Sequence, residues 1–185
     1  MALSGWHESD EIGLVIAAQA GDLHAFDRLA QRYRPAAVTI ARQLLPHEAA
    51  EDAAQDALLA AFKAVPQLED PSRFSAWLGT IVRNRARKLG LQRSKEPLPL
   101  DRVILAYAPS VLAQVESGDV ANELRCAIAA LPADVREAVD LHHLQGWTAV
   151  ETATFLGLPL STVKWRLHTG RRLLRSRLAF LEDEL

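Results

Sequence analysis

Cysteine and aromatic residues are scarce in this chain. Its 185 residues include one cysteine, Cys126, and aromatic residues make up 6% of the total. A single thiol excludes an intramolecular disulfide and a CxxC metal site. Cys126 lies in an alanine- and leucine-rich helical pattern, so we expect its side chain to be buried as packing.

Long hydrophobic runs and alternating strand patterns are also missing. No apolar stretch approaches the length needed to cross a bilayer. The N-terminus has Glu8, Asp10 and Glu11 where a signal peptide has a basic start and an apolar core. We therefore expect a soluble, cytoplasmic protein with no membrane insertion. Because alanine and leucine dominate a 49% hydrophobic composition, the sequence predicts an all-α fold with a buried core.

A large charge of one sign is absent as well. The formal net charge is −2, so the chain as a whole has no general attraction to nucleic acid. Acidic and basic residues are nevertheless segregated along the sequence. It is this distribution, and not the total, that indicates where partners bind.

From Gly146 to Arg177 the sequence has the pattern of a helix-turn-helix. Thr148 and Glu151, three positions apart, form a capping box that predicts the start of a helix. Gly157 is placed to end that helix in a left-handed conformation. The spacing therefore predicts a short helix followed by a tight turn.

The second helix of this motif begins at Ser161 or Thr162, either of which can cap it. Because the second helix of such a motif enters the DNA major groove, the pattern predicts nucleic-acid binding. The alternative is an amphipathic hairpin whose arginines only solvate a surface. Positions 164 to 177 contain no acidic residue and six basic ones: Lys164, Arg166, Arg171, Arg172, Arg175 and Arg177.

Turn residues divide the chain into two helical blocks. Residues 95–120 contain three prolines and no long amphipathic repeat, so they predict a linker. We expect two small domains, at residues 10–94 and 121–181. The expected helices are Asp10–Ala20, Leu23–Tyr33, Ala36–Leu45 with Pro35 in its first turn, Glu48–Val65, Ser72 to about Gly90, Asn122–Ala130, and one after Pro132, followed by the helix-turn-helix.

Acidic residues form a stripe on the predicted helix Glu48–Val65. They recur at three- and four-residue spacing, as Glu48, Glu51, Asp52 and Asp56. A solvated face and a protein-docking surface fit this pattern about equally. A metal or acid–base site fits it poorly, because no histidine lies at ligand spacing.

The helix that follows reverses the sign of the charge. Phe74 and Trp77 lie just upstream of this basic segment, and aromatic rings beside cations suit single-stranded nucleic acid. The alternative is that both rings belong to the core, and for Trp77 we favour it. The basic residues are Arg83, Arg85, Arg87, Lys88, Arg93 and Lys95.

Three segments, taken in order, resemble the extracytoplasmic-function (ECF) sigma factors, a subfamily of the sigma-70 factors of bacterial RNA polymerase. They are AEDAAQDALLAAFKAV (Ala50–Val65), FSAWLGTIVRNRARK (Phe74–Lys88) and the stretch from Leu131 to Leu174. The resemblance implies sigma domain 2, a linker and sigma domain 4. It also implies a factor that binds core RNA polymerase and directs transcription initiation at promoter DNA, with no catalytic residue, metal or cofactor.

The resemblance also assigns roles by position, and it implies an anti-sigma protein as a further partner. The residues implied in docking on core polymerase are Glu51, Asp52, Gln55 and Asp56. Those implied at the −10 element are Asp70, Ser72, Arg73, Phe74, Arg83, Asn84, Arg87 and Lys88. Those implied at the −35 element are Ser161, Thr162, Lys164, Trp165, His168 and Thr169, with Arg166, Arg171 and Arg172 on phosphates.

Three positions depart from the family pattern. Trp165 and Thr169 replace a small polar residue and an arginine, and Lys88 replaces an acidic residue. An indole can contact a thymine methyl group but cannot make bidentate hydrogen bonds to guanine. Trp165 therefore either gives an unusual −35 preference or packs against its own domain.

Two other functional classes are alternatives to a sigma factor for this sequence. A stand-alone helix-turn-helix regulator would need a dimer or a ligand pocket, and no heptad run is present to supply the dimer. A metal enzyme using Glu51, Asp52 and Asp56 lacks partner histidines and a glycine-rich phosphate loop.

Overall fold

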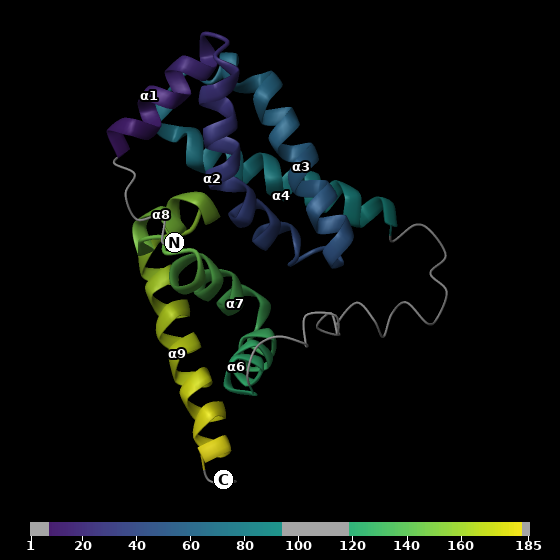
Figure 1. Ribbon diagram of the computed structural model, residues 1–185, viewed down its shortest axis with the longest axis vertical. Coiled ribbons are helices and arrows are strands. Elements are labelled where there is room, and N and C mark those ends of the chain that lie inside the picture. The colour runs from purple at the N-terminus through teal and green to yellow at the C-terminus, as the bar shows by residue number, and fades with distance from the viewer. Residues whose placement is uncertain (1–7, 94–118, 183–185) are drawn as a thin grey trace.

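The computed structural model describes residues 8–93 and 119–182, and all regular secondary structure within these ranges is helical. Figure 1 shows two groups of helices, the N-terminal bundle (residues 8–93) above and the C-terminal bundle (residues 119–182) below. The all-α fold is confirmed. No helix in the described ranges is both long and apolar enough to cross a membrane. The predicted linker lies almost wholly outside the described residues.

The N-terminal bundle is built on close packing between alanine-rich helices. Its elements are α1 (Glu8–Gln19), α2 (Leu23–Ala41), α3 (His47–Ala64) and α4 (Phe74–Arg93), with short 3₁₀ turns at η1 (Val65–Gln67) and η2 (Pro71–Arg73). Helix α3 packs against both α2 and α4. Its inner face consists of small side chains that allow this approach: Ala50, Ala53, Ala54, Ala57 and Ala61, each at most 3% exposed.

The predicted break at Pro35 is wrong, because α2 continues through it as one helix from Leu23 to Ala41. Proline removes one backbone hydrogen bond and normally kinks or ends a helix. Here buried residues lie on both sides of it, including Leu29, Tyr33 and Ile40. The packing of these side chains outweighs the lost hydrogen bond.

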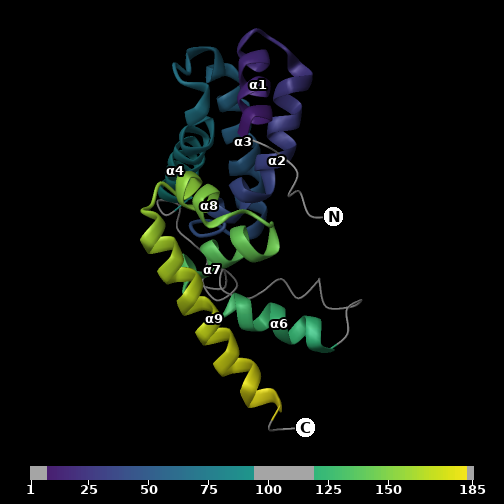
Figure 2. The same ribbon diagram turned by 90° about the vertical axis from the view of Figure 1, so that its left-hand side faces the viewer.

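The C-terminal bundle contains the predicted helix-turn-helix. Its elements are α6 (Asp119–Ala129), α7 (Ala133–Val139), a π-helical turn η4 (Asp140–Leu144), α8 (Ala149–Leu156) and α9 (Leu160–Glu182). The capping box of Thr148 and Glu151 is present, and Gly157 ends α8 at φ 66°. Helix α9 begins at Leu160, one residue before the first of the two predicted caps, and its C-terminal end extends beyond the other helices (Figure 2).

The prediction that Cys126 is buried is wrong, because its side chain is exposed. Residues 123–126 of α6 all face solvent, and the helix buries Ala127 instead. These four residues make about one full helical turn, so this part of α6 is exposed on all sides and a different rotation of the helix would not bury Cys126. Sequence periodicity indicated a helix but not how much of its length packs against α9.

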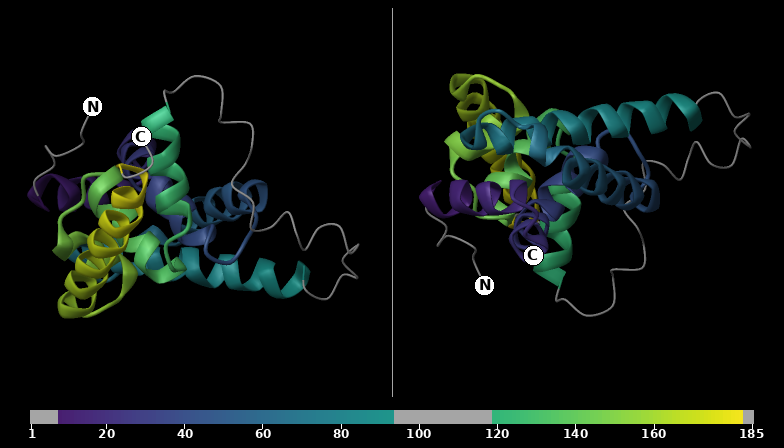
Figure 3. Two further views of the ribbon diagram at one scale, coloured as in Figure 1. Left: turned by 90° about the horizontal axis from the view of Figure 1, so that it is seen from below. Right: turned by 90° about the horizontal axis from the view of Figure 1, so that it is seen from above.

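The two bundles pack against each other and share one hydrophobic core. This core joins Tyr33 and Phe74 of the N-terminal bundle to Trp147 and Phe155 of the C-terminal bundle. Helix α8 lies directly on α4. Seen from above and below, α3 and the C-terminal part of α4 extend away from α9 (Figure 3). We predicted two domains on a tether and did not predict this contact.

Helices α7 and α9 approach each other closely at Gly170 of α9. A Cβ atom placed there would lie 2.6 Å from Val139 Cγ2 and 3.2 Å from Val135 Cγ1 of α7. We expect Gly170→Ala to destabilise this bundle by about 1–3 kcal/mol, because overpacking forces the two helices apart.

Urea unfolding followed by circular dichroism measures the effect of Gly170→Ala. Gly13→Ala in α1 is the matched control, since no atom lies within 4 Å of the added methyl group. Alanine has the better helix propensity, so the control should gain about 0.5–1 kcal/mol. Equal shifts for the two variants would contradict the packing argument.

Candidate nucleic-acid interface

One face of α9 presents polar, basic and aromatic side chains to solvent. Lys164, Trp165 and His168 are exposed near its N-terminus, and Arg171 and Arg172 follow one turn later. The opposite face buries Val163 and Leu167 in the C-terminal bundle. Spacings of three and four residues place the exposed group on one side of the helix. This face has the composition of a major-groove reader.

The indole of Trp165 is 59% exposed and is not part of the hydrophobic core. The structure therefore does not support the interpretation in which Trp165 packs against its own domain. A large apolar side chain held in water beside Lys164 is available for contact with a base edge. Ser161 is exposed and Thr162 and Thr169 are half-buried on the same helix.

Arg166 faces inward, unlike the other predicted phosphate-binding residues. Its Nε lies 3.5 Å from Asp134 Oδ2, and its Nη1 lies 3.7 Å from Glu137 Oε2. The side chain is 15% exposed. Arg166 therefore fastens α9 to α7 in this structure, and its geometry does not fit the phosphate role that we predicted.

Glu137 lies at the junction of the two bundles. Burial raises the pKa of its carboxyl group to about 7, while the nearby guanidinium groups of Arg166 and Arg83 act in the opposite direction. Burial likewise raises the pKa of Asp140 to about 6. Both carboxyl groups therefore titrate close to neutral pH.

The loop before α4 is fixed by Asp70. Its Oδ1 accepts hydrogen bonds from the Ser72 amide at 3.0 Å and the Ser72 hydroxyl at 2.6 Å. The Ser72 hydroxyl is the main cause of the lowered pKa of Asp70, so this carboxylate stays ionised. Ser72 and Arg73 are both exposed, with Arg73 paired to Asp70 at 3.6 Å.

Phe74 lies in the core and is 1% exposed. Its ring centroid lies 5.5 Å from that of Tyr33 and 5.7 Å from that of Trp77. A ring enclosed in this way cannot stack on a base, so the predicted nucleic-acid role of Phe74 does not fit this conformation. Trp77 is half-buried against the same core, as we favoured.

Only some of the predicted −10 residues in the basic half of α4 are exposed to solvent. Asn84, Arg87 and Lys88 are exposed. Arg83 instead donates from Nη1 to the backbone carbonyl of Phe155 in α8 at 2.8 Å. Arg83 is therefore engaged between the bundles, while the other predicted −10 residues of α4 and its preceding loop, apart from the buried Phe74, are exposed.

The acidic stripe on α3 is exposed and partly paired. Glu51 lies 3.5 Å from Arg34 and 3.7 Å from Arg42, and Asp56 lies 3.0 Å from Arg85. Asp52 and Gln55 are exposed between them. Such surface ion pairs contribute little to stability and can exchange partners. No cluster of three or more metal-ligating side chains is found among the described residues.

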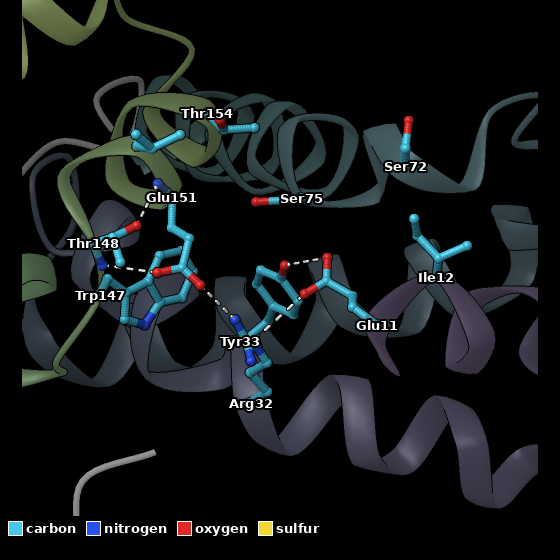
Figure 4. Close-up of a pocket in the computed structure, with 11 residues that line it drawn as sticks. Glu11, Ile12, Arg32, Tyr33, Ser72, Ser75, Trp147, Thr148, Glu151 and Thr154 are labelled. Atoms are coloured by element: carbon cyan, nitrogen blue, oxygen red, sulfur yellow. Dashed lines mark hydrogen bonds and ion pairs between the residues drawn. The ribbon is translucent and has the colours of Figure 1, made fainter. Parts of the chain in front are cut away.

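Sequence reasoning missed a polar pocket where the two bundles meet. It has a volume of about 300 Å³ and is lined by residues of α1, α2, α4 and α8. Figure 4 shows Arg32 between two carboxylates, Glu11 at 3.6 Å and Glu151 at 2.9 Å. Arg32 and Glu151 are 119 positions apart. No local pattern could have joined them.

Comparison with known proteins identifies two family models in this chain. Residues 29–95 match Sigma-70 region 2, and residues 121–174 match Sigma-70, region 4. The chain is 32% identical to the ECF RNA polymerase sigma factor SigM of Mycobacterium tuberculosis (strain H37Rv), over 98% of this chain and 91% of that one. It is 27% identical to the ECF RNA polymerase sigma-E factor of Escherichia coli K12, over 85% and 88% of the two chains.

Two solved structures have a similar fold. CnrH in complex with the cytosolic domain of CnrY has a TM-score of 0.59 and 28% identity, covering 92% of this chain and 97% of that one. The sigma factor RpoE of Bartonella quintana, in complex with the anti-sigma factor NepR, has a TM-score of 0.58 and 30% identity, covering 83% and 96%.

The raised pKa of Glu137 predicts that stability depends on pH. Its folded value of about 7 exceeds the ordinary value of 4.5, so the folded state holds more protons than the unfolded state between these limits. The stability that this group contributes is fully present below pH 4.5 and is lost as the pH rises through 7. We therefore expect the urea midpoint to fall from about pH 5 to about pH 8.

The variant Glu137→Gln isolates this group, because glutamine does not titrate and has nearly the same shape. Its urea midpoint should fall less steeply over the same pH range, with Asp140 providing part of the remaining slope. The same slope in the wild type and the variant would show that the Glu137 carboxyl does not titrate in this way.

Proposed function

Because this chain belongs to the ECF subfamily of sigma-70 factors, we propose that its two bundles divide promoter recognition between them. A sigma factor binds core RNA polymerase and directs initiation at promoter DNA, and this chain does so. In our proposal the C-terminal bundle reads the −35 element, and the N-terminal bundle docks on the polymerase and holds the −10 element. The observation that carries the proposal is the exposed basic and aromatic face of α9.

At the −35 element, α9 enters the major groove. Lys164, Trp165 and His168 face base edges, and Arg171 and Arg172 bind phosphates. Arg166 acts as a positioning residue, since its ion pairs to α7 fix how α9 projects from the bundle. Phosphate contacts supply salt-dependent affinity and register, while the base contacts supply sequence preference.

At the −10 element, the N-terminal bundle captures bases of the opened strand. The loop held by Asp70 presents Ser72 and Arg73, and Asn84, Arg87 and Lys88 are exposed further along α4. Unstacking a base costs a few kcal/mol, and a polar site with cationic neighbours offsets that cost once the base is extruded. Capture of the extruded bases requires non-covalent binding and no covalent chemistry.

We assign docking on core polymerase to the acidic stripe of α3. Asp52 and Gln55 face solvent, and Glu51 and Asp56 can exchange their arginine partners for basic groups of the polymerase. A sigma factor works with polymerase in the cytoplasm, where we place this protein. The similar structures with CnrY and NepR support an anti-sigma protein as its regulator.

In-vitro transcription with purified core polymerase tests the function as a whole. We expect discrete start sites on a library of genomic fragments only when this protein is added. Sequence-specific DNA binding by the protein alone, without new start sites, would favour the stand-alone regulator. The same assay on a mapped promoter then serves for the variants below.

The docking assignment predicts that the double variant Asp52→Ala, Gln55→Ala loses affinity for core polymerase by roughly tenfold, because charges at an interface steer and orient the partner. Asp27→Ala, Gln31→Ala is the matched control, since it removes an exposed aspartate and glutamine from α2. Titration of core polymerase in the transcription assay measures both. Equal affinities would refute the docking assignment and leave the DNA contacts unaffected.

The position of Trp165 predicts an effect on sequence preference. We expect Trp165→Ser to lose about 1–3 kcal/mol of discrimination at one base pair of the −35 element, because the apolar contact with a thymine methyl group is removed. The thermal midpoint should not change, since the side chain is 59% exposed. Leu124→Ser, at an exposed leucine of α6, is the control. Selection from a randomised −35 library measures the preference at every position.

A further inference from the structure

The polar pocket described above has walls from α1, α2, α4 and α8 and from the turn η2. Its volume of about 300 Å³ is at the lower end of the range found for small-molecule sites. Among the described residues that line it, only Ser72 belongs to a predicted promoter or polymerase surface. Most of this cavity therefore has no part in the function proposed above.

The charged side chains that line the pocket are two carboxylates and one guanidinium, so their formal charges sum to −1. They are Glu11, Glu151 and Arg32. The side chains of Glu11 and Arg32 are 16% and 12% exposed, so both lie mostly inside the protein. Arg32 lies between the two carboxylates, as Figure 4 shows, and one guanidinium cannot neutralise both. A ligand with one positive charge would balance these groups, whereas an anion would be repelled.

The carboxylate of Glu151 is the group on which such a ligand can be anchored. Its Oε1 accepts a hydrogen bond from Arg32 at 2.9 Å, and its Oε2 accepts one from the Thr148 amide at 2.7 Å. An ionised carboxylate has about four acceptor sites, so both oxygens can accept a further hydrogen bond. The Glu151 side chain is 39% exposed and can be reached from solvent. An ammonium group, with three N–H donors, suits this acceptor.

Apolar side chains also line the pocket. Trp147 and Val150 come from the segment around Glu151, and Ile12 comes from α1. Val150 is 60% exposed and Ile12 is half-buried, so both have apolar surface left for a bound molecule. Alkyl groups prefer such surfaces to water, and an indole ring attracts a cation. This wall suits a cation with a hydrocarbon chain better than a hydrated metal ion.

We propose that this pocket is a binding site for a small primary alkylamine that carries one positive charge. The ammonium group donates to the Glu151 carboxylate, and the alkyl chain packs on Trp147, Val150 and Ile12. The bound amine touches α1 and α8 at the same time. The site is independent of the sigma function, and its test needs only the protein itself.

Titration of the full chain with n-butylamine, followed by proton–nitrogen correlation NMR, tests the proposal. Like a lysine side chain, butylamine is protonated at neutral pH. It should bind saturably with a Kd in the millimolar range, as expected for so small a ligand. The amides of Thr148 and Glu151 and the indole N–H of Trp147 should shift with one common Kd. The neutral analogue 1-butanol, of the same length, is the matched control and should show no saturable shift.

The variant Glu151→Gln removes the anchoring charge and keeps a residue type that can complete the capping box of α8. We expect it to weaken the affinity for butylamine by roughly tenfold or more, because a hydrogen bond to a charged group is lost. Glu123→Gln, at an exposed glutamate of α6 outside the pocket, is the matched control and should bind butylamine as the wild type does.

The variant Val150→Lys serves if Glu151→Gln does not fold. Val150 is 60% exposed, so the protein can accept a lysine there, and the new ammonium group competes for the Glu151 carboxylate. Butylamine binding should be lost. Leu124→Lys adds the same charge at an exposed leucine of α6 outside the pocket and should leave the binding unchanged.

Four results would overturn the proposal. They are the absence of a saturable shift with butylamine, equal affinities for butylamine and 1-butanol, an unchanged affinity in folded Glu151→Gln, and an unchanged affinity in folded Val150→Lys. Adenosine monophosphate is the probe for an anionic ligand. If it shifts the same amides saturably and butylamine does not, the pocket takes a nucleotide and the assigned ligand class is wrong.

Discussion

The buried ring of Tyr33 is the point on which the arrangement of the whole chain depends. It projects from α2 and touches Phe74 of α4, Trp147 before α8, and Phe155 within α8. A buried phenol needs a hydrogen-bond partner, and its hydroxyl donates to Glu11 of α1 at 2.8 Å. Burial raises the pKa of Tyr33 above its usual range, so the hydroxyl remains a donor.

The polar groups around this ring form a continuous series of contacts from α1 to α8. Glu11 accepts from Tyr33 and pairs with Arg32, which in turn pairs with Glu151. Glu151 also accepts the Thr148 amide as part of the capping box of α8. One carboxylate therefore serves both the start of a helix and the contact between bundles. A change in the orientation of the bundles would leave several partly buried charges without partners.

Helix α9 shows a similar division between its buried and its exposed side chains. Basic residues on one face of α9 remain in water, while Arg166 turns inward to the carboxylates of Asp134 and Glu137. That inward pair fixes the helix on α7 without neutralising the outer face. With a net charge of −2, the chain as a whole has little general attraction for duplex DNA, so the proposed DNA contacts would have to supply its affinity locally.

Local chemistry within the sequence determined the helices and the motif. The capping box at Thr148, the left-handed Gly157 and the basic run after Lys164 act over a few residues, and each was predicted where it occurs. The continuity of α2 through Pro35, the exposure of Cys126 and the burial of Phe74 were decided by tertiary packing. Tertiary packing also determined the inward orientation of the Arg166 side chain and the contact of α8 with α4. These features join residues far apart in the chain, and no local pattern encodes which distant surface a helix face will meet.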